Sequence, residues 1–176
     1  ANPPAGLASS VQRITPADLK AFHARYYTVR NAVLVLVGDI DRKTAEDIAA
    51  NFSQHLPPGD AAPALPEPEP LKRARRQHIE MSSQQTYVLL GELGLSRHDP
   101  DYFPLLVANE ILGGSGFGSL LTRELREKRG LTYSVSSQFV PMRMPGPFQI
   151  SFSTRADQAE AALQLTQQLL ADFVRT

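Results

Sequence analysis

The chain has 176 residues, and its 18 basic and 18 acidic side chains leave no formal net charge at pH 7. This length is enough for one domain with a sizeable core or for parts of two domains. The charge balance gives no global attraction to nucleic acid or to an anionic membrane. Cysteine is absent, which excludes disulfides and thiolate metal sites. The compartment stays open, and a periplasmic location is compatible with the missing cysteines.

No membrane span is predicted, because the longest purely apolar run, Ala32 to Val37, is far too short to cross a bilayer. The first residue is Ala1 rather than Met, and no signal-like apolar segment follows it. The last residues lie inside a helical pattern without a stop signal. These features predict a piece cut from a longer polypeptide.

The first third of the chain predicts an extended stretch over 1–13, then helix, strand and helix. Thr15-Pro16-Ala17-Asp18 places a hydroxyl, a proline and an acid where a helix begins, and that helix is expected to run to Tyr27. Asn31 to Gly38 is apolar on both alternating faces, which suits a strand covered on both sides. Asp41 can cap the next helix. Because one strand cannot form a sheet, its partner strands are expected outside this segment.

A proline-rich stretch over residues 57–71 predicts a semi-rigid extended linker between two domains, residues 1–56 and residues 72–176. The basic run Lys72-Arg73-Ala74-Arg75-Arg76 follows the linker. A nucleic-acid surface would need more such charge and interleaved aromatic residues, so a solvated strand start is predicted and no nucleic-acid partner is expected.

Strands are predicted in the second domain over Gln77–Ser82 and Thr86–Leu93. Asp99 or Asp101 can cap the following helix, which carries Phe103, Leu106, Val107 and Ile111 near one face. A short helix capped by Ser119 ends near Lys128, with Glu124 paired to Lys128 and Gly130 just past its end.

A hairpin follows, in which Tyr133–Phe139 pairs with the strand of Phe148, Ile150 and Phe152 around a Pro-Gly-Pro turn. A capping box at Asp157 opens a last long helix. Strands clustered with helices predict an α+β fold, a mostly antiparallel sheet with helices packed on one face.

Four glycines, at positions 113, 114, 116 and 118, precede the short helix and allow a sharp turn or a close approach. A phosphate-binding P-loop would need a lysine and a hydroxyl residue after the last glycine, but Ser119-Leu120 follows here. A dinucleotide fingerprint has a different spacing and lies between a strand and a helix. Neither nucleotide site is therefore predicted.

The segments Ile111-Leu112-Gly113-Gly114 and Ser119 to Val135 (SLLTRELREKRGLTYSV) resemble the M16 zinc metallopeptidases, the pitrilysin-like and mitochondrial-processing-peptidase-like family. The resemblance implies mostly antiparallel domains carrying helices. It also implies that an arginine and a tyrosine seven positions apart help to bind substrate, here Arg126 and Tyr133, with the glycines Gly113, Gly114, Gly116 and Gly118 in a loop near the substrate. Thr15 to Asp41 resembles the end of the preceding M16 domain.

The zinc motif of that family, His-x-x-Glu-His, is not found around any of the four histidines, His23, His55, His78 and His98. No two of them have the spacing of a helical ligand pair. Zinc is therefore expected in the full enzyme or in a partner subunit and not on this chain. The chain is not expected to hydrolyse peptides alone.

A plain structural alternative exists for both candidate residues. Tyr133 shares a strand face with Val135 and Phe139, so it could be a core tyrosine, and Arg126 could be a solvated helix residue. The spacing that the chain shares with the family favours substrate binding instead. A phenol and a guanidinium are suitable donors to a scissile carbonyl oxygen, where negative charge develops.

The predicted function is the substrate-binding region of an M16 zinc endopeptidase. Its expected partners are a peptide or protein substrate and a catalytic M16 subunit or the missing part of the same polypeptide. The alternative is a non-peptidase M16-like subunit that serves only in assembly.

Overall fold

The computed structural model describes residues 4–114, 116 and 118–175, which fall into a first unit up to Leu65 and a second from Pro66. The division falls inside the proline-rich stretch that the sequence marks as a linker. The assignment of both units to M16-like domains stays a prediction at this point. No helix formed by the described residues has the length and apolarity needed to cross a bilayer.

The first unit contains helices α1 (Ala8–Val11), α2 (Pro16–Tyr26) and α3 (Arg42–Ser53) and a 3-10 turn, η1 (Val29–Asn31). Both predicted caps are confirmed. The Thr15 hydroxyl accepts a hydrogen bond from the Asp18 amide at 3.2 Å, and the Asp41 carboxylate accepts one from the Thr44 amide at 2.7 Å. Helix α1 corrects the expectation of a fully extended stretch over residues 1–13.

The strand predicted over Asn31 to Gly38 does not form. Residues 32–37 pair with no strand among the residues that the structure describes, and Val33 and Val37 are 89% and 93% exposed. An isolated segment has no neighbour to accept and donate the ladder hydrogen bonds, so a strongly apolar strand pattern stays unpaired.

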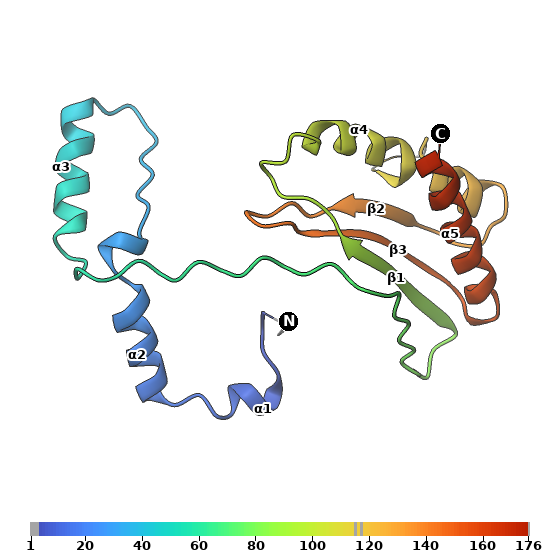
Figure 1. Cartoon of the computed structure of the whole chain (residues 1–176), viewed down its shortest axis with the longest axis horizontal. Coiled ribbons are helices and arrows are strands. Elements are labelled where there is room, and N and C mark those ends of the chain that lie inside the picture. Colours follow the sequence, from blue (N-terminus) through green and yellow to red (C-terminus); the bar gives the residue numbers. More distant parts are fainter. Residues whose placement is uncertain (1–3, 115, 117, 176) are drawn as a thin grey trace. The chain divides into compact units, whose positions relative to one another are not determined.

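The second unit is built on a three-stranded antiparallel sheet of β1 (Gln85–Leu93), β2 (Val135–Phe139) and β3 (Pro147–Arg155) (Figure 1). The strand order is β1-β3-β2, and the register aligns Val88, Phe152 and Val135 across the sheet. The predicted β2–β3 hairpin is confirmed. Strand β2 begins at Val135, so Tyr133 lies before it.

Helices cover one face of this sheet. They are α4 (Tyr102–Gly113), a short helix whose Thr122–Glu127 part is π-helical (η2), and α5 (Ala159–Arg175) (Figure 1). Alternate residues of β3 are buried beneath them, and the core consists of Leu112, Leu121, Leu125, Val135, Phe148, Ile150, Phe152 and Ala162. The predicted α+β class, an antiparallel sheet with helices on one face, is confirmed.

Helix α4 turns its apolar side outward, contrary to the usual expectation for such a stripe. The stripe residues Phe103, Val107 and Ile111 are exposed. The buried residues of α4 are Asn109, Leu112 and Gly113, and Leu112 is part of the core. Helix α4 approaches β2 closely at Gly113, where a Cβ would lie 2.6 Å from the Ser137 hydroxyl oxygen. Ser137 Oγ donates to Asn109 Oδ1 at 2.7 Å there, and Asn109 Nδ2 donates to the Ser137 backbone carbonyl at 3.0 Å. This close approach requires glycine at position 113.

Three further predictions are corrected in detail. Gln77–Ser82 is not a strand, because nothing in the described part of the chain pairs with it. Asp157 does not open a capping box; it lies in a 3-10 turn, Ala156–Gln158, before α5, and its carboxylate pairs with Arg155. Asp101 precedes α4 without a side-chain cap.

Candidate functional site

Arg126 and Tyr133 are brought together at the end of the η2 helix. Gly130 has a φ of 60°, the left-handed conformation predicted for the residue after this helix. The chain therefore turns back at once, and the Leu131 amide donates to the Leu125 carbonyl at 2.8 Å. The Arg126 guanidinium carbon consequently lies 5.0 Å from the centroid of the Tyr133 ring.

Tyr133 is 83% exposed, so the alternative that it is a core tyrosine is wrong. The Arg126 guanidinium lies over one face of this exposed ring. A cation–π contact at an exposed site contributes only about 0.5–1 kcal/mol. The contact orients the two groups, but it is too weak to fix the ring by itself.

The backbone next to Tyr133 is fixed by two buried threonines, Thr132 and Thr154, which we call the threonine clamp. The Thr154 hydroxyl on β3 donates to the Leu131 carbonyl at 2.6 Å. The Thr132 hydroxyl lies 2.7 Å from the carbonyl oxygens of both Ser134 and Ser153, and its single proton can serve one of them at a time. The sequence pattern did not reveal this clamp, because nothing in the spacing of Thr154 relates it to Leu131.

The η2 helix is held at its surface by one carboxylate and three cations. The Glu124 carboxylate lies 2.7 Å from the Lys128 ammonium and 2.7 Å from the Arg129 guanidinium, with Arg123 at 3.5 Å. The predicted Glu124–Lys128 pair is confirmed. Hydrogen bonds from Lys128 and then Arg129 lower the pKa of Glu124 to about 2, against the opposing effect of desolvation.

This lowered pKa predicts an acid-sensitive contribution to stability. Because the pKa is about 2 in the folded chain and 4.5 for a free glutamate, the contribution is complete above pH 4.5 and is lost as the pH falls toward 2. Glu124→Gln is expected to lower the urea midpoint at neutral pH and to match the parent near pH 2. Glu127→Gln, an exposed change on the same helix, is the control. A parent–variant difference that stays constant over this pH range would contradict the assignment.

The four glycines do not share one environment. Gly113 is required by the contact between α4 and β2, and a Cβ on Gly114 would lie 2.6 Å from the Glu110 Cα. Gly116 has a φ of 133°, and Gly116 and Gly118 both face open space. Ser115 and Phe117 lie outside the described residues. The prediction that this loop is near the substrate stays a prediction.

The donor set does not fit a zinc ion. The described residues contain no group of three or more histidine, cysteine, aspartate or glutamate side chains that could hold a metal. The His23 ring stacks on Tyr27 at 4.7 Å, His55 Nδ1 lies 2.6 Å from the Asn51 carbonyl, and His78 pairs with Glu80. These histidines therefore do not form a zinc site with one another among the described residues.

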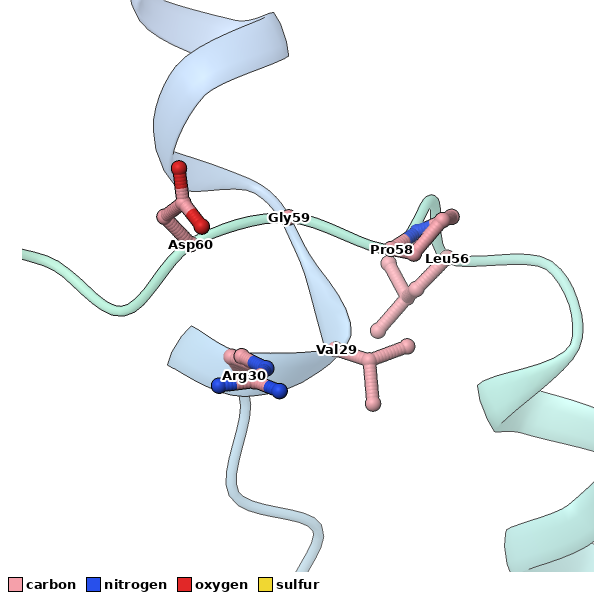
Figure 2. A pocket seen from close by; sticks show the side chains of 6 residues that line it. All are labelled: Val29, Arg30, Leu56, Pro58, Gly59 and Asp60. Carbon is pink, nitrogen blue, oxygen red and sulfur yellow. The ribbon is translucent and has the colours of Figure 1, made fainter.

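A hollow of about 590 Å³ lies in the first unit. Figure 2 shows it between the loop of Leu56 to Asp60 and the turn that bears Val29 and Arg30. The loop is held by backbone and side-chain contacts, such as the Val29 amide to the Pro57 carbonyl at 3.1 Å. Arg30 and Asp60 are the charged residues that line this hollow, and its lining includes neither a nucleophilic side chain nor a group of metal ligands. The hollow is therefore not the candidate functional site.

The second unit thus has an α+β fold and presents an exposed tyrosine, Tyr133, with the half-buried Arg126 against its ring at a helix end. The family model of the peptidase M16 inactive domain matches residues 13–176. The chain belongs to the peptidase M16 family.

Two curated relatives support this assignment. An uncharacterized zinc protease of Streptomyces coelicolor is 30% identical over 169 residues, which cover 93% of this chain and 37% of that protein. An uncharacterized zinc protease of Bacillus subtilis is 30% identical over 160 residues, 90% of this chain and 38% of that protein. The chain therefore spans about two fifths of the length of these relatives.

Two solved structures share the fold. The peptidase M16 inactive domain from Pseudomonas fluorescens is 48% identical, with a TM-score of 0.91 over 97% of this chain and 41% of that chain. A protease from Helicobacter pylori has a TM-score of 0.75 at 24% identity over 96% of this chain and 42% of that chain, a likeness of fold alone.

Proposed function

We propose that this chain is the substrate-binding region of an M16 zinc endopeptidase. The observation that supports the proposal most strongly is the exposed Tyr133 ring with the Arg126 guanidinium 5.0 Å from its centroid, in a domain of this family. An aromatic ring that is 83% exposed has no packing role in the core of this unit, and its phenol lies at the surface.

The pair would act by hydrogen bonding to the peptide backbone. The Tyr133 phenol donates one hydrogen bond to a substrate carbonyl oxygen, and the planar Arg126 guanidinium donates to a neighbouring carbonyl or carboxylate. Donors placed before the reaction stabilise the charge that develops on the scissile carbonyl oxygen. The chain would therefore supply orientation and electrostatic stabilisation.

An extended peptide is the substrate shape that this surface suits. Tyr133 lies two residues before β2, which is an edge strand in the order β1-β3-β2 of the described sheet. Edge strands can bind an extended peptide through backbone hydrogen bonds while surface side chains select it. Tyr133 would then contact the peptide just beyond the strand.

We also propose that residues 1–56 are the end of a first M16-like domain, residues 57–71 a linker and residues 72–176 the start of a second domain. Among the described residues of the first unit only Thr28 is buried, and apolar side chains such as Phe22 and Val33 are exposed. So much exposed apolar surface requires cover from outside these residues. The missing part of the polypeptide or a catalytic M16 subunit would supply the cover and the zinc site.

Peptide hydrolysis by the zinc-loaded assembly tests the proposal. We use this term for the chain together with the zinc-binding M16 region, whether that region is on the same polypeptide or on a partner subunit. Hydrolysis of extended peptides that requires this chain is the expected result. Failure of every M16 partner to give zinc-dependent cleavage would instead favour the alternative of a non-peptidase assembly subunit.

A further inference from the structure

Side-chain packing does not fix the position of the Tyr133 ring. Its side chain is 83% exposed, so neighbouring apolar groups do not hold the ring in place. The stacking contact with Arg126 is a weak interaction at an exposed site. The position of the ring must therefore come mainly from the backbone that bears it.

That backbone is held from two sides by the residues just before Tyr133. On the helix side, the Leu131 amide donates to the Leu125 carbonyl, one residue before Arg126. On the sheet side, the Leu131 carbonyl accepts from the Thr154 hydroxyl at 2.6 Å, and the Thr132 hydroxyl lies 2.7 Å from the Ser153 carbonyl oxygen. The helix end with Arg126 and the start of Tyr133 are thus tied to the same strand, β3.

We infer that Thr132 and Thr154 are positioning residues, whose buried hydroxyls hold the Tyr133 ring against the Arg126 guanidinium. The inference rests on the proposed function, in which this pair contacts the substrate. Thr132 is 7% exposed and Thr154 is 4% exposed, so water cannot readily replace either hydrogen bond. A valine at either position would occupy a similar volume without donating a proton, which would release the Leu131–Thr132 backbone from β3.

The first experiment measures the geometry in the 176-residue chain by NMR. The ring current of Tyr133 shifts the Arg126 side-chain protons upfield, and Tyr133→Leu gives the unshifted reference. Thr154→Val is expected to lose most of this shift, and Thr154→Ser to keep it because the hydroxyl remains. Thr166→Val is the matched control, because Thr166 is also a buried threonine whose hydroxyl donates to a carbonyl, that of Ala162, at 2.7 Å. An unchanged Arg126 shift in folded Thr154→Val would overturn the inference.

A second pair of variants guards against simple loss of folding. Thr132→Val and Thr132→Ser change the other hydroxyl of the clamp and are expected to lose and keep the Arg126 shift, respectively. The chemical shifts of core methyl groups report folding independently in each sample. Loss of the Arg126 shift in Thr166→Val as well would show a general loosening of the domain and would overturn the assignment to the clamp.

The second experiment measures peptide cleavage by the zinc-loaded assembly. A displaced pair should lower kcat/KM by about tenfold in Thr154→Val, because small misplacements of a positioning group have large kinetic effects. Thr154→Ser should restore the parent value, and Thr166→Val should leave it unchanged. If Tyr133→Phe cleaves as well as the parent, the proposed function fails, while the NMR result still decides whether the threonines position the ring. Parent-like kcat/KM in Thr154→Val alongside an impaired Tyr133→Phe would overturn the inference.

Discussion

Tyr133→Phe is expected to lower kcat for peptide cleavage by the zinc-loaded assembly about a hundredfold, the scale measured when one donor to a developing oxyanion is removed. The phenyl ring keeps its exposed position and its face toward Arg126, so only the hydroxyl is lost. The effect should fall on kcat more than on KM, because the hydrogen bond strengthens as charge develops on the carbonyl oxygen.

The control variant is Tyr87→Phe. Tyr87 is another exposed tyrosine and lies on β1, so this change also removes one exposed phenol hydroxyl. Tyr87 alternates with Val88 and Leu90, which contact the core, so Tyr87 lies on the face of the sheet opposite the helices. Its cleavage rate should equal that of the parent. Equal rates for the parent and Tyr133→Phe would remove Tyr133 from the site.

Leu125→Ala is expected to lower the free energy of unfolding of the second unit by about 2–5 kcal/mol, the range found when buried leucines are truncated. Leu125 is fully buried, with 0% exposure, and belongs to the core between η2 and the sheet. Its carbonyl also accepts the Leu131 amide that starts the turn toward Tyr133. The variant should therefore weaken both the core and the support of the site.

Urea unfolding followed by circular dichroism measures this effect, with Leu71→Ala as the matched control. Leu71 is an exposed leucine of the same unit, so its truncation should change the unfolding free energy by no more than about 0.5 kcal/mol. Similar unfolding curves for both variants would show that the η2 helix is not part of the cooperative core.

Local signals in the sequence predicted much of this fold, because the groups that make them are close together in the chain. Thr15 and Asp41 cap helices through amides three residues away. Gly130 adopts the left-handed conformation that ends the η2 helix. Alternating apolar residues predicted β1 and the β2–β3 hairpin for the same reason, since each strand shows its own buried face.

The errors arose where the outcome depends on partners that are distant in sequence or outside the described residues. Residues 32–37 have a strong strand pattern and yet stay unpaired, because a strand requires a neighbour. In α4, the apolar stripe is exposed and the helix instead buries Asn109, Leu112 and Gly113, with Gly113 close to Ser137. Periodicity reports which residues are apolar but not which surface will be covered.

The candidate site also contains some features that the sequence predicted and others that it did not. Family resemblance predicted Arg126 and Tyr133, and the structure brings them together. The threonine clamp could not be found from spacing, because Thr154 lies 23 residues from Leu131 and meets it only through the sheet. Glu124 shows both cases, since the pair with Lys128 follows helical spacing, whereas the contact with Arg129 depends on the widened π-helical turn.

The most direct test of the central claim, that Tyr133 contacts the substrate, is photo-crosslinking in the zinc-loaded assembly. A benzophenone amino acid replaces Tyr133 in one sample and Tyr87 in another, and each is irradiated with an extended peptide. Mass spectrometry should find peptide attached at position 133 and not at position 87, with unlabelled peptide competing for the adduct. Bound peptide that gives no adduct at position 133, or equal adducts at both positions, would contradict the claim.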